Sequence, residues 1–312
     1  MVLYELKLKI KSPFMTPWQS DILFGHMAWS YRERFGEEAL TEWLEDFVDL
    51  PPFVLSDGLI EGSFPRPMIP PPEAKIHTKT EKIEQIQKGK RLKNVRYVSE
   101  EDFLPFLEGK EMTFQHHVKG AYEDIVRTHN VISRESNTSL ANDGLFEEKS
   151  TVLKGHDRLS IFVRVKDKQI LEEVCDLMEY ISYTGYGKKK NLGYGHFELV
   201  NVVKRNDLEQ RTDQANAVIL LSHSVPKKDD PIEGWYKLAT KYGRVGARAK
   251  IKGSYIKKPF TRIMPGSVFR TSNPKGFYGR IINNIAPGNE TIVQFCYSLA
   301  LPVKLPAYLE RE

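Results

Sequence analysis

The segment at residues 185–195 combines glycines, lysines and tyrosines in a pattern suited to binding a phosphate chain. Its four glycines permit positive φ angles, so consecutive backbone N–H groups can point outward toward an anion. Three adjacent lysines add positive charge, and Tyr183, Tyr186 and Tyr194 offer faces for stacking on unpaired bases. We expect RNA contacts from Gly185, Tyr186, Gly187, Lys188, Lys189, Lys190, Gly193, Tyr194 and Gly195. The alternative is a helix-to-strand turn whose lysines face only water.

A dinucleotide-binding loop does not fit this segment. Gly185 and Gly187 form a G-x-G pair, but Lys190 stands where a third glycine is required. The loop also follows a predicted helix and precedes a strand. That order is the reverse of the one that places a helix N-terminus on a pyrophosphate.

A second concentration of positive charge lies at residues 244–262, which hold seven Lys or Arg and no acidic residue. We expect Arg248, Lys257, Lys258 and Arg262 to contact phosphate groups. The basic stretch at residues 75–96 is more typical of a solvated surface. The whole chain carries a net charge of only +5, so these local clusters are more informative than the total.

A predicted β-ribbon at residues 123–153 supplies a third set of polar side chains. Arg127 and His129 share one face of its first strand, and Arg134 follows near its tip. We expect these three residues to contact RNA, and the alternative is a solvated ribbon face.

Histidine and cysteine spacing predicts no metal site and no cofactor. His116, His117 and His129 have no carboxylate or cysteine at ligand spacing. The only cysteines, Cys175 and Cys296, are too far apart for a metal motif, and they suit a reducing cytoplasm. No signal-peptide pattern and no membrane-spanning run of apolar residues is found, so we expect a cytoplasmic protein without membrane contact.

The elements that position these residues follow a recognisable order. Strands are predicted at residues 2–10, 159–165 and 196–203, and helices at residues 16–35 and 170–181. A long insertion at about residues 50–155 separates the two halves of this pattern. The order predicts an α+β protein whose first domain, residues 1–205, is a ferredoxin-like (RRM-like) βαββαβ unit with an expanded middle.

The second domain is predicted at residues 206–312, after a polar linker. Strands are expected at residues 217–222, 268–269 and 291–301, and a helix at residues 235–242. We expect a second ferredoxin-like unit here.

Several motifs in this chain occur in the same order in a known protein family. They are residues 16–26 (TPWQSDILFGH), 52–57 (PFVLSD), 65–67 (PRP), 144–146 (GLF), the loop at 185–195 with His196-Phe197, and 265–269 (PGSVF). Together they resemble RAMP proteins, and in particular the subunit of type III-A CRISPR effector (Csm) complexes that holds the 5′ handle of the guide RNA. The type III-B (Cmr) counterpart is the alternative within the superfamily.

The resemblance implies two ferredoxin-like folds with the RNA handle held across them. It implies a non-catalytic subunit for antiviral defence, which docks against the large polymerase-domain subunit and the repeated backbone subunit. Ser20, within the first signature, is expected to contact RNA. The competing hypothesis is a metal-independent endoribonuclease that processes precursor guide RNA with His26 as the base. In processing relatives the glycine-rich loop lies near the C-terminus, whereas more than a hundred residues follow it here.

Overall fold

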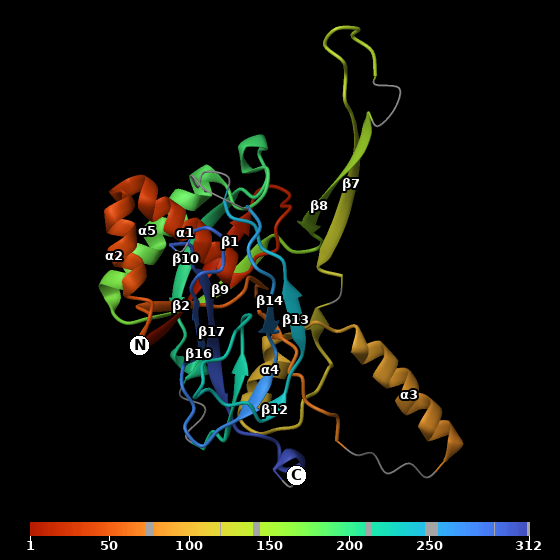
Figure 1. Ribbon diagram of the computed structural model, residues 1–312. Helices are drawn as coiled ribbons and strands as arrows, with labels where there is room; N and C mark the ends of the chain where they lie inside the picture. Colours follow the sequence, from red (N-terminus) through yellow and green to blue (C-terminus); the bar gives the residue numbers. More distant parts are fainter. Residues whose placement is uncertain are drawn as a thin grey trace.

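The computed structural model describes residues 1–72, 78–118, 120–139, 144–209, 214–246, 255–289 and 291–310. Two five-stranded antiparallel sheets form the body of the chain, and three smaller sheets lie beside them (Figure 1). The mixed α+β class predicted from the sequence is confirmed.

The first sheet brings together strands from both ends of the predicted first domain. Its members are β1 (Val2–Ile10), β2 (Phe53–Leu55), β3 (Leu59–Ile60), β9 (Arg158–Val165) and β10 (Phe197–Lys204). The strand order is β10-β1-β9-β2, with β3 also paired to β9. Helix α1 (Ser20–Phe35) lies between β1 and β2 in the chain, and α5 (Lys168–Thr184) between β9 and β10. The predicted order of strands and helices in this half is confirmed.

Helix α5 forms where the sequence pattern predicts it. The Asp167 carboxylate accepts a hydrogen bond from the Ile170 N–H at 3.0 Å and so caps the helix. Its apolar stripe, which includes Val174, Leu177 and Ile181, is fully buried. The helix ends before Gly185, whose φ of 80° is a left-handed conformation that favours glycine.

Helix α1 begins at Ser20 rather than at residue 16, where the predicted helix starts. The Thr16 hydroxyl accepts a hydrogen bond from the backbone N–H of Lys188, so it does not cap the helix. Asp57 supplies the missing acceptor, because its Oδ1 atom receives the Ser20 N–H at 2.9 Å.

The insertion builds a small subdomain and a long arm. Helix α2 (Glu37–Glu45) precedes it, and its own elements beside the first sheet are β4 (Ser63–Pro65), α3 (Lys79–Lys93), β5 (Tyr97–Ser99), α4 (Glu100–Leu107), β6 (His117–Val118), β7 (Tyr122–Asn130) and β8 (Leu145–Leu153). Strands β4, β5 and β6 form one sheet, while β7 and β8 form another, and Thr151 of β8 also bridges to Phe14. Figure 1 shows the β7–β8 arm projecting away from the body of the chain. The predicted ribbon is confirmed.

The face of the first sheet opposite α1 and α5 is covered by the insertion. Phe64 of β4 stacks on Phe162 of β9 at 5.2 Å, and Phe103 of α4 stacks on Phe64 at 4.2 Å. Nearby, the buried Arg205 guanidinium contacts Glu5 at 2.7 Å. Because these side chains are buried, this part of the face does not present the open aromatic surface that an RRM uses for RNA.

The second sheet consists of β11 (Ala217–Leu220), β12 (Gly234–Trp235), β15 (Val268–Arg270), β16 (Phe277–Ile282) and β17 (Gln294–Val303), in the order β12-β15-β11-β17-β16. A separate ribbon pairs β13 (Leu238–Lys241) with β14 (Phe260–Ile263). The predicted helix at residues 235–242 is wrong, since this segment forms β12 and β13. Beyond Thr184, the described residues form no α-helix, so a second ferredoxin-like unit with its own helices is not seen.

One hydrophobic core joins the two sheets. It includes Leu6 and Leu8 of β1 together with Ile219 of β11 and Leu299 of β17. Helix α1 lies across this junction, where Phe24 stacks on Phe295 of β17 with ring centres 4.3 Å apart. The boundary predicted between residues 205 and 206 therefore falls between segments that share a core.

Candidate nucleic-acid interface

The glycine-rich loop at residues 185–195 is anchored on the N-terminal part of the chain. The Gly187 N–H donates to Nε2 of His26 at 3.0 Å, and the Lys188 N–H donates to the Thr16 hydroxyl at 2.9 Å. The Tyr186 N–H donates to the Gly195 carbonyl at 2.9 Å. These consecutive amides are therefore satisfied within the protein, and the predicted outward nest of N–H groups is wrong for residues 186–188.

The glycines of the loop do adopt the predicted positive φ angles. The values are 80° at Gly185, 80° at Gly187, 88° at Gly193 and 70° at Gly195. At Gly195 a Cβ atom would lie 2.0 Å from the carbonyl oxygen of Tyr186, so a side chain cannot be accommodated. Here the glycines serve close packing of the loop rather than exposure of its amides.

Tyr186 faces the core rather than RNA. Its ring is 0% exposed and stacks on Trp18 at 4.1 Å, and its hydroxyl donates to the Pro17 carbonyl at 2.8 Å. Tyr194 is also buried, and its hydroxyl donates to Glu148 Oε1 at 2.5 Å. The predicted base stacking by these two tyrosines is therefore wrong, because burial of a large ring in the core removes its faces from contact. Tyr183, in contrast, is 76% exposed.

The three lysines of the loop meet three different environments. Lys189 forms an ion pair with the buried carboxylate of Glu148 on β8. Lys190 is partly covered by the loop, and this burial lowers its pKa. Lys188 is exposed to solvent. Lys188 is thus the lysine of this loop best placed to meet a phosphate.

His26 is held by the same loop. Burial, followed by the positive charge of Lys190, lowers the pKa of His26 to about 4. The imidazole is therefore neutral near pH 7, and its Nε2 atom already accepts the Gly187 N–H. To act as a general base, the imidazole needs a ring nitrogen that is free to accept the proton of the substrate. The bound Nε2 atom therefore weighs against the nuclease hypothesis.

The β7–β8 arm presents its predicted side chains to solvent. Arg127, His129 and Arg134 are all exposed. The register pairs His129 with Phe146 of β8, and the two rings stack at 5.3 Å. Arg127 and His129 lie on one strand at alternate positions, as predicted, and both remain accessible to a partner.

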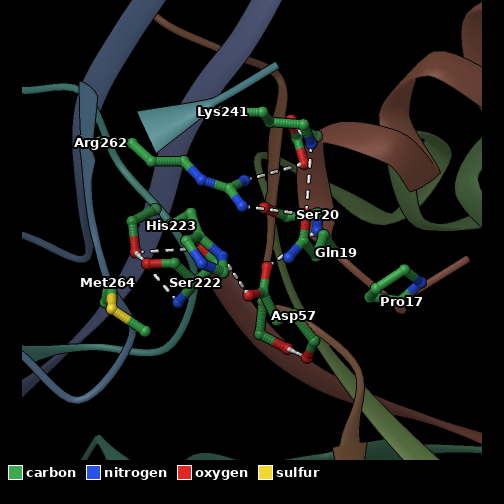
Figure 2. A network of polar contacts seen from close by, with 12 residues as sticks. Pro17, Gln19, Ser20, Asp57, Ser222, His223, Lys241, Arg262 and Met264 are labelled. Atoms are coloured by element: carbon green, nitrogen blue, oxygen red, sulfur yellow. Dashed lines mark hydrogen bonds and ion pairs between the residues drawn. The ribbon is translucent and has the colours of Figure 1, made fainter. Parts of the chain in front are cut away.

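Ser20 belongs to a buried polar network where the two sheets meet, seen in Figure 2. Its side chain is buried, and its N–H is bound by Asp57. The other carboxylate oxygen of Asp57 lies 2.6 Å from Nδ1 of His223. Burial raises the pKa of Asp57, but the charge of His223 and the hydrogen bonds from His223 and Ser20 outweigh it and leave that pKa below its usual value. The prediction that Ser20 contacts RNA is wrong in this conformation.

Side chains from part of the basic segment at residues 244–262 belong to the same polar network. Arg262 is 8% exposed and lies 3.7 Å from Asp21, and Lys257 Nζ donates to Gln294 Oε1 at 2.8 Å. Burial lowers the pKa of Lys257 to about 8. These two residues are engaged inside the protein, so their predicted phosphate contacts are not available. Lys258 is exposed as predicted, and Arg248 lies outside the described residues.

The part of the chain that the structure describes offers neither a metal site nor a membrane-spanning helix. There, no three histidine, cysteine or acidic side chains are grouped to hold a metal ion. No helix in this part is both long and apolar enough to span a membrane.

Comparison with known proteins places this geometry in a known fold. No protein-family model matches the chain, and no curated protein matches its sequence. The crystal structure of the Csm1–Csm4 cassette in complex with cA4 matches with a TM-score of 0.60 and 15% identity, over 97% of this chain and 99% of that chain. The Csm3–Csm4 subcomplex of the type III-A CRISPR–Cas interference complex matches with a TM-score of 0.58 and 18% identity, over 97% and 100% of the two chains.

This chain has the Csm4 fold. The resemblance seen in the sequence motifs is thereby confirmed at the level of structure. Because the sequence identities are low, this chain and the matching proteins share the fold rather than the sequence.

The Csm4 fold also brings together residues that the sequence analysis did not select. Asp21 contacts Arg262 and Lys241, and its Oδ2 accepts a hydrogen bond from Gln294 at 2.7 Å. His223, the partner of Asp57, was not selected either. Asp57 and Asp21 both lie inside the quoted motifs, so the motifs marked these positions. Their partners follow about 170 to 270 residues later, and no local pattern links them.

Proposed function

We propose that this chain is a Csm4-like subunit of a type III-A CRISPR interference complex. The main support for the proposal is the extent of the structural match, because it covers almost all of this chain and almost all of each matching chain. The matching structures contain Csm4 together with Csm1 or with Csm3. By analogy, the partners of this chain are a Csm1-like polymerase-domain subunit and a Csm3-like backbone subunit.

Within that complex, we assign to this chain the binding of the 5′ handle of the guide RNA. Exposed cations support this role at two places, the glycine-rich loop with Lys188 and the arm with Arg127 and Arg134. Tyr183, at the end of α5, adds an exposed aromatic ring close to Lys188 in the chain. Cations with an aromatic surface are the usual means of holding an unpaired RNA strand.

We assign no catalytic role to the chain. The support is the state of His26, whose pKa is lowered to about 4 and whose Nε2 atom is bound by the loop that would face the RNA. A cytoplasmic location is part of the proposal, and the two free cysteines are consistent with it.

Reconstitution tests the proposal. The full chain would be mixed with the Csm1-like and Csm3-like proteins of the same CRISPR locus and with their guide RNA, and the products separated by size. We expect a stable complex that contains this chain and loses integrity when it is omitted. If the chain stays free in the presence of all three components, the proposal is wrong.

The nuclease alternative is tested in the same preparation. The purified chain would be incubated with labelled repeat RNA in EDTA. A discrete cut that disappears in a His26→Ala variant would establish the enzyme and contradict the non-catalytic assignment. We expect intact RNA in both samples.

A further inference from the structure

Several cations of the second half lie on a hairpin with two chemically different faces. Strands β13 and β14 pair along their length, and the two segments pair again further along after a register shift of one residue. There, Arg244 bridges to Ile256, and the Val245 N–H donates to the Tyr255 carbonyl at 2.8 Å. We call residues 238–246 and 255–263 the basic hairpin.

The inner face of the basic hairpin is used for internal packing. Lys241 and Arg262 turn toward Asp21 of α1, and Lys257 is hydrogen-bonded to Gln294 of β17. These cations neutralise or satisfy buried polar groups, which is the usual condition for burying a charge. They hold the hairpin against the body of the chain and are not free for a ligand.

The outer face carries a second set of side chains at alternate positions. Since Arg244 lies opposite Ile256, the residues two positions away on each strand, Tyr242 and Lys258, share the same face. Tyr242 is 76% exposed and Ile256 56% exposed, and Arg244 and Lys258 are exposed too. Within the described part of the chain, Tyr242, Arg244 and Lys258 have no side-chain hydrogen bond or ion pair.

The charge along this part of the sequence is of one sign. Between Glu233 and Glu290 the sequence has twelve Lys or Arg and no Asp or Glu. A run of this length without an acidic residue gives a local field that attracts a polyanion. Alternate residues of a strand stand about 7 Å apart, so Tyr242 and Arg244 present a ring and a cation to successive units of an extended chain.

The inner face of the basic hairpin lies beside the segment that anchors the glycine-rich loop. Gln19 links the two, because its side-chain oxygen accepts hydrogen bonds from Lys241 and from Arg262, each at 3.2 Å. Its backbone N–H contacts the hydroxyl of Tyr186 in the loop at 3.4 Å. The hairpin and the loop are therefore both held by Gln19.

We propose that the outer face of the basic hairpin is a second RNA-binding surface, where one unpaired base stacks on Tyr242 and phosphate groups contact Arg244 and Lys258. The inference rests on the proposed function and extends it, since it assigns to the hairpin a sequence-tolerant grip on single-stranded RNA. An exposed tyrosine between cations suits a strand with accessible base faces better than a duplex or an acidic protein surface.

Stacking is tested with the full chain and a short fluorescent oligoadenylate, by fluorescence anisotropy. We expect Tyr242→Ala to weaken binding about ten-fold, whereas Tyr242→Phe keeps the ring and the affinity. Tyr255→Ala, on the other face of the same hairpin, is the matched control and should bind like the unmodified chain. With an oligonucleotide that lacks bases, the difference in affinity between the unmodified chain and the Tyr242→Ala variant should vanish.

The charges are tested in a salt series with the same probe. For two phosphate contacts to a single strand, Arg244→Ala with Lys258→Ala should reduce the slope of log affinity against log salt by roughly 1.4. Lys227→Ala with Lys228→Ala removes two exposed lysines outside the hairpin and should leave the slope unchanged.

The outcomes separate this inference from the proposed function. If Lys188→Ala weakens RNA binding while all hairpin variants bind normally, the inference is wrong and the proposed function stands. If the full chain binds no RNA in any form, both are wrong. If the hairpin variants keep RNA affinity but no longer assemble with the other subunits, the outer face docks a protein and the inference is overturned.

Discussion

Lys188 and Lys189 are neighbours in the glycine-rich loop, but their side chains have different tasks. Lys188 extends into solvent, while Lys189 reaches back to the buried Glu148 carboxylate. Residue type alone predicted an RNA contact for both. The distinction depends on a carboxylate that lies on β8, about forty residues earlier in the chain, so it was not visible from the loop sequence.

The loop tyrosines show the same limit at the residue scale. The sequence predicted correctly that the glycines adopt positive φ angles, because that property is local. It did not predict that Tyr186 turns inward, since its partner Trp18 lies far away in the chain. Aromatic rings suit cores and binding surfaces equally well, so their type does not decide between the two.

Replacing Lys188 with alanine should weaken RNA binding without affecting the fold. One lost phosphate contact should reduce the slope of log affinity against log salt by about 0.7. Fluorescence anisotropy with the guide RNA handle, over a series of salt concentrations, measures this slope. Lys189→Ala is the contrasting variant, because it leaves the Glu148 carboxylate without its ion pair and should lower the free energy of unfolding by about 1–2 kcal/mol. Equal slopes for Lys188→Ala and the unmodified chain would contradict the assignment.

His26 should make the stability of the chain depend on pH between about 4 and 6.5. Its folded-state pKa of about 4 lies below the usual value of 6.5, so the unfolded chain binds the extra proton in this window. The free energy of unfolding should therefore rise with pH across it, by roughly 3 kcal/mol from this group. Urea unfolding at several pH values measures the rise, and His26→Gln should remove His26's share of it. A parallel pH profile in that variant would contradict the buried, neutral imidazole.

At the scale of elements, the sequence was most reliable where one pattern extends over many residues. Helix α5 combines a cap, an apolar stripe and a terminal glycine, and its prediction is confirmed. The segment of β12 and β13 was predicted as a helix, and that prediction is wrong. Its exposed Leu238, Thr240 and Tyr242 alternate with half-buried residues, and that two-residue period is typical of a strand.

The β7–β8 arm should be mobile in the isolated chain and ordered in a complex. Two strands alone are marginally stable in water, and this arm exposes Val126, Leu145 and Phe146. We expect its amide hydrogens to exchange rapidly in the free chain and slowly after assembly with RNA and partner subunits. Hydrogen exchange followed by mass spectrometry measures this, with α5 as the internal reference. Strong protection of the arm in the free chain would contradict the expectation.

At the scale of the whole molecule, α1 is the element that unites the two sheets. Its Phe24 ring contacts Trp43, Phe47 and Phe295, which come from the first half and from β17. The sequence predicted two domains because a polar linker separates two sets of strands. It did not reveal the shared core, because the apolar residues that form it are spread over the entire chain.

The shared core predicts cooperative unfolding. Phe24→Ala should lower the free energy of unfolding by about 3–5 kcal/mol, since it leaves a cavity at the junction. Tryptophan fluorescence and far-UV circular dichroism should report one common transition in urea, before and after the substitution. Phe35→Ala, at an exposed position of the same helix, should have a much smaller effect. Two separate transitions would contradict the shared core.

We propose that this chain holds guide RNA within a Csm-type complex. Ultraviolet crosslinking of the reconstituted ribonucleoprotein, with crosslinked peptides located by mass spectrometry, tests it most directly. We expect crosslinks in peptides that contain Tyr183 and Lys188 and in the β7–β8 arm, and none at the buried Tyr186. A complex in which this chain carries no RNA crosslink, while neighbouring subunits do, would contradict the claim.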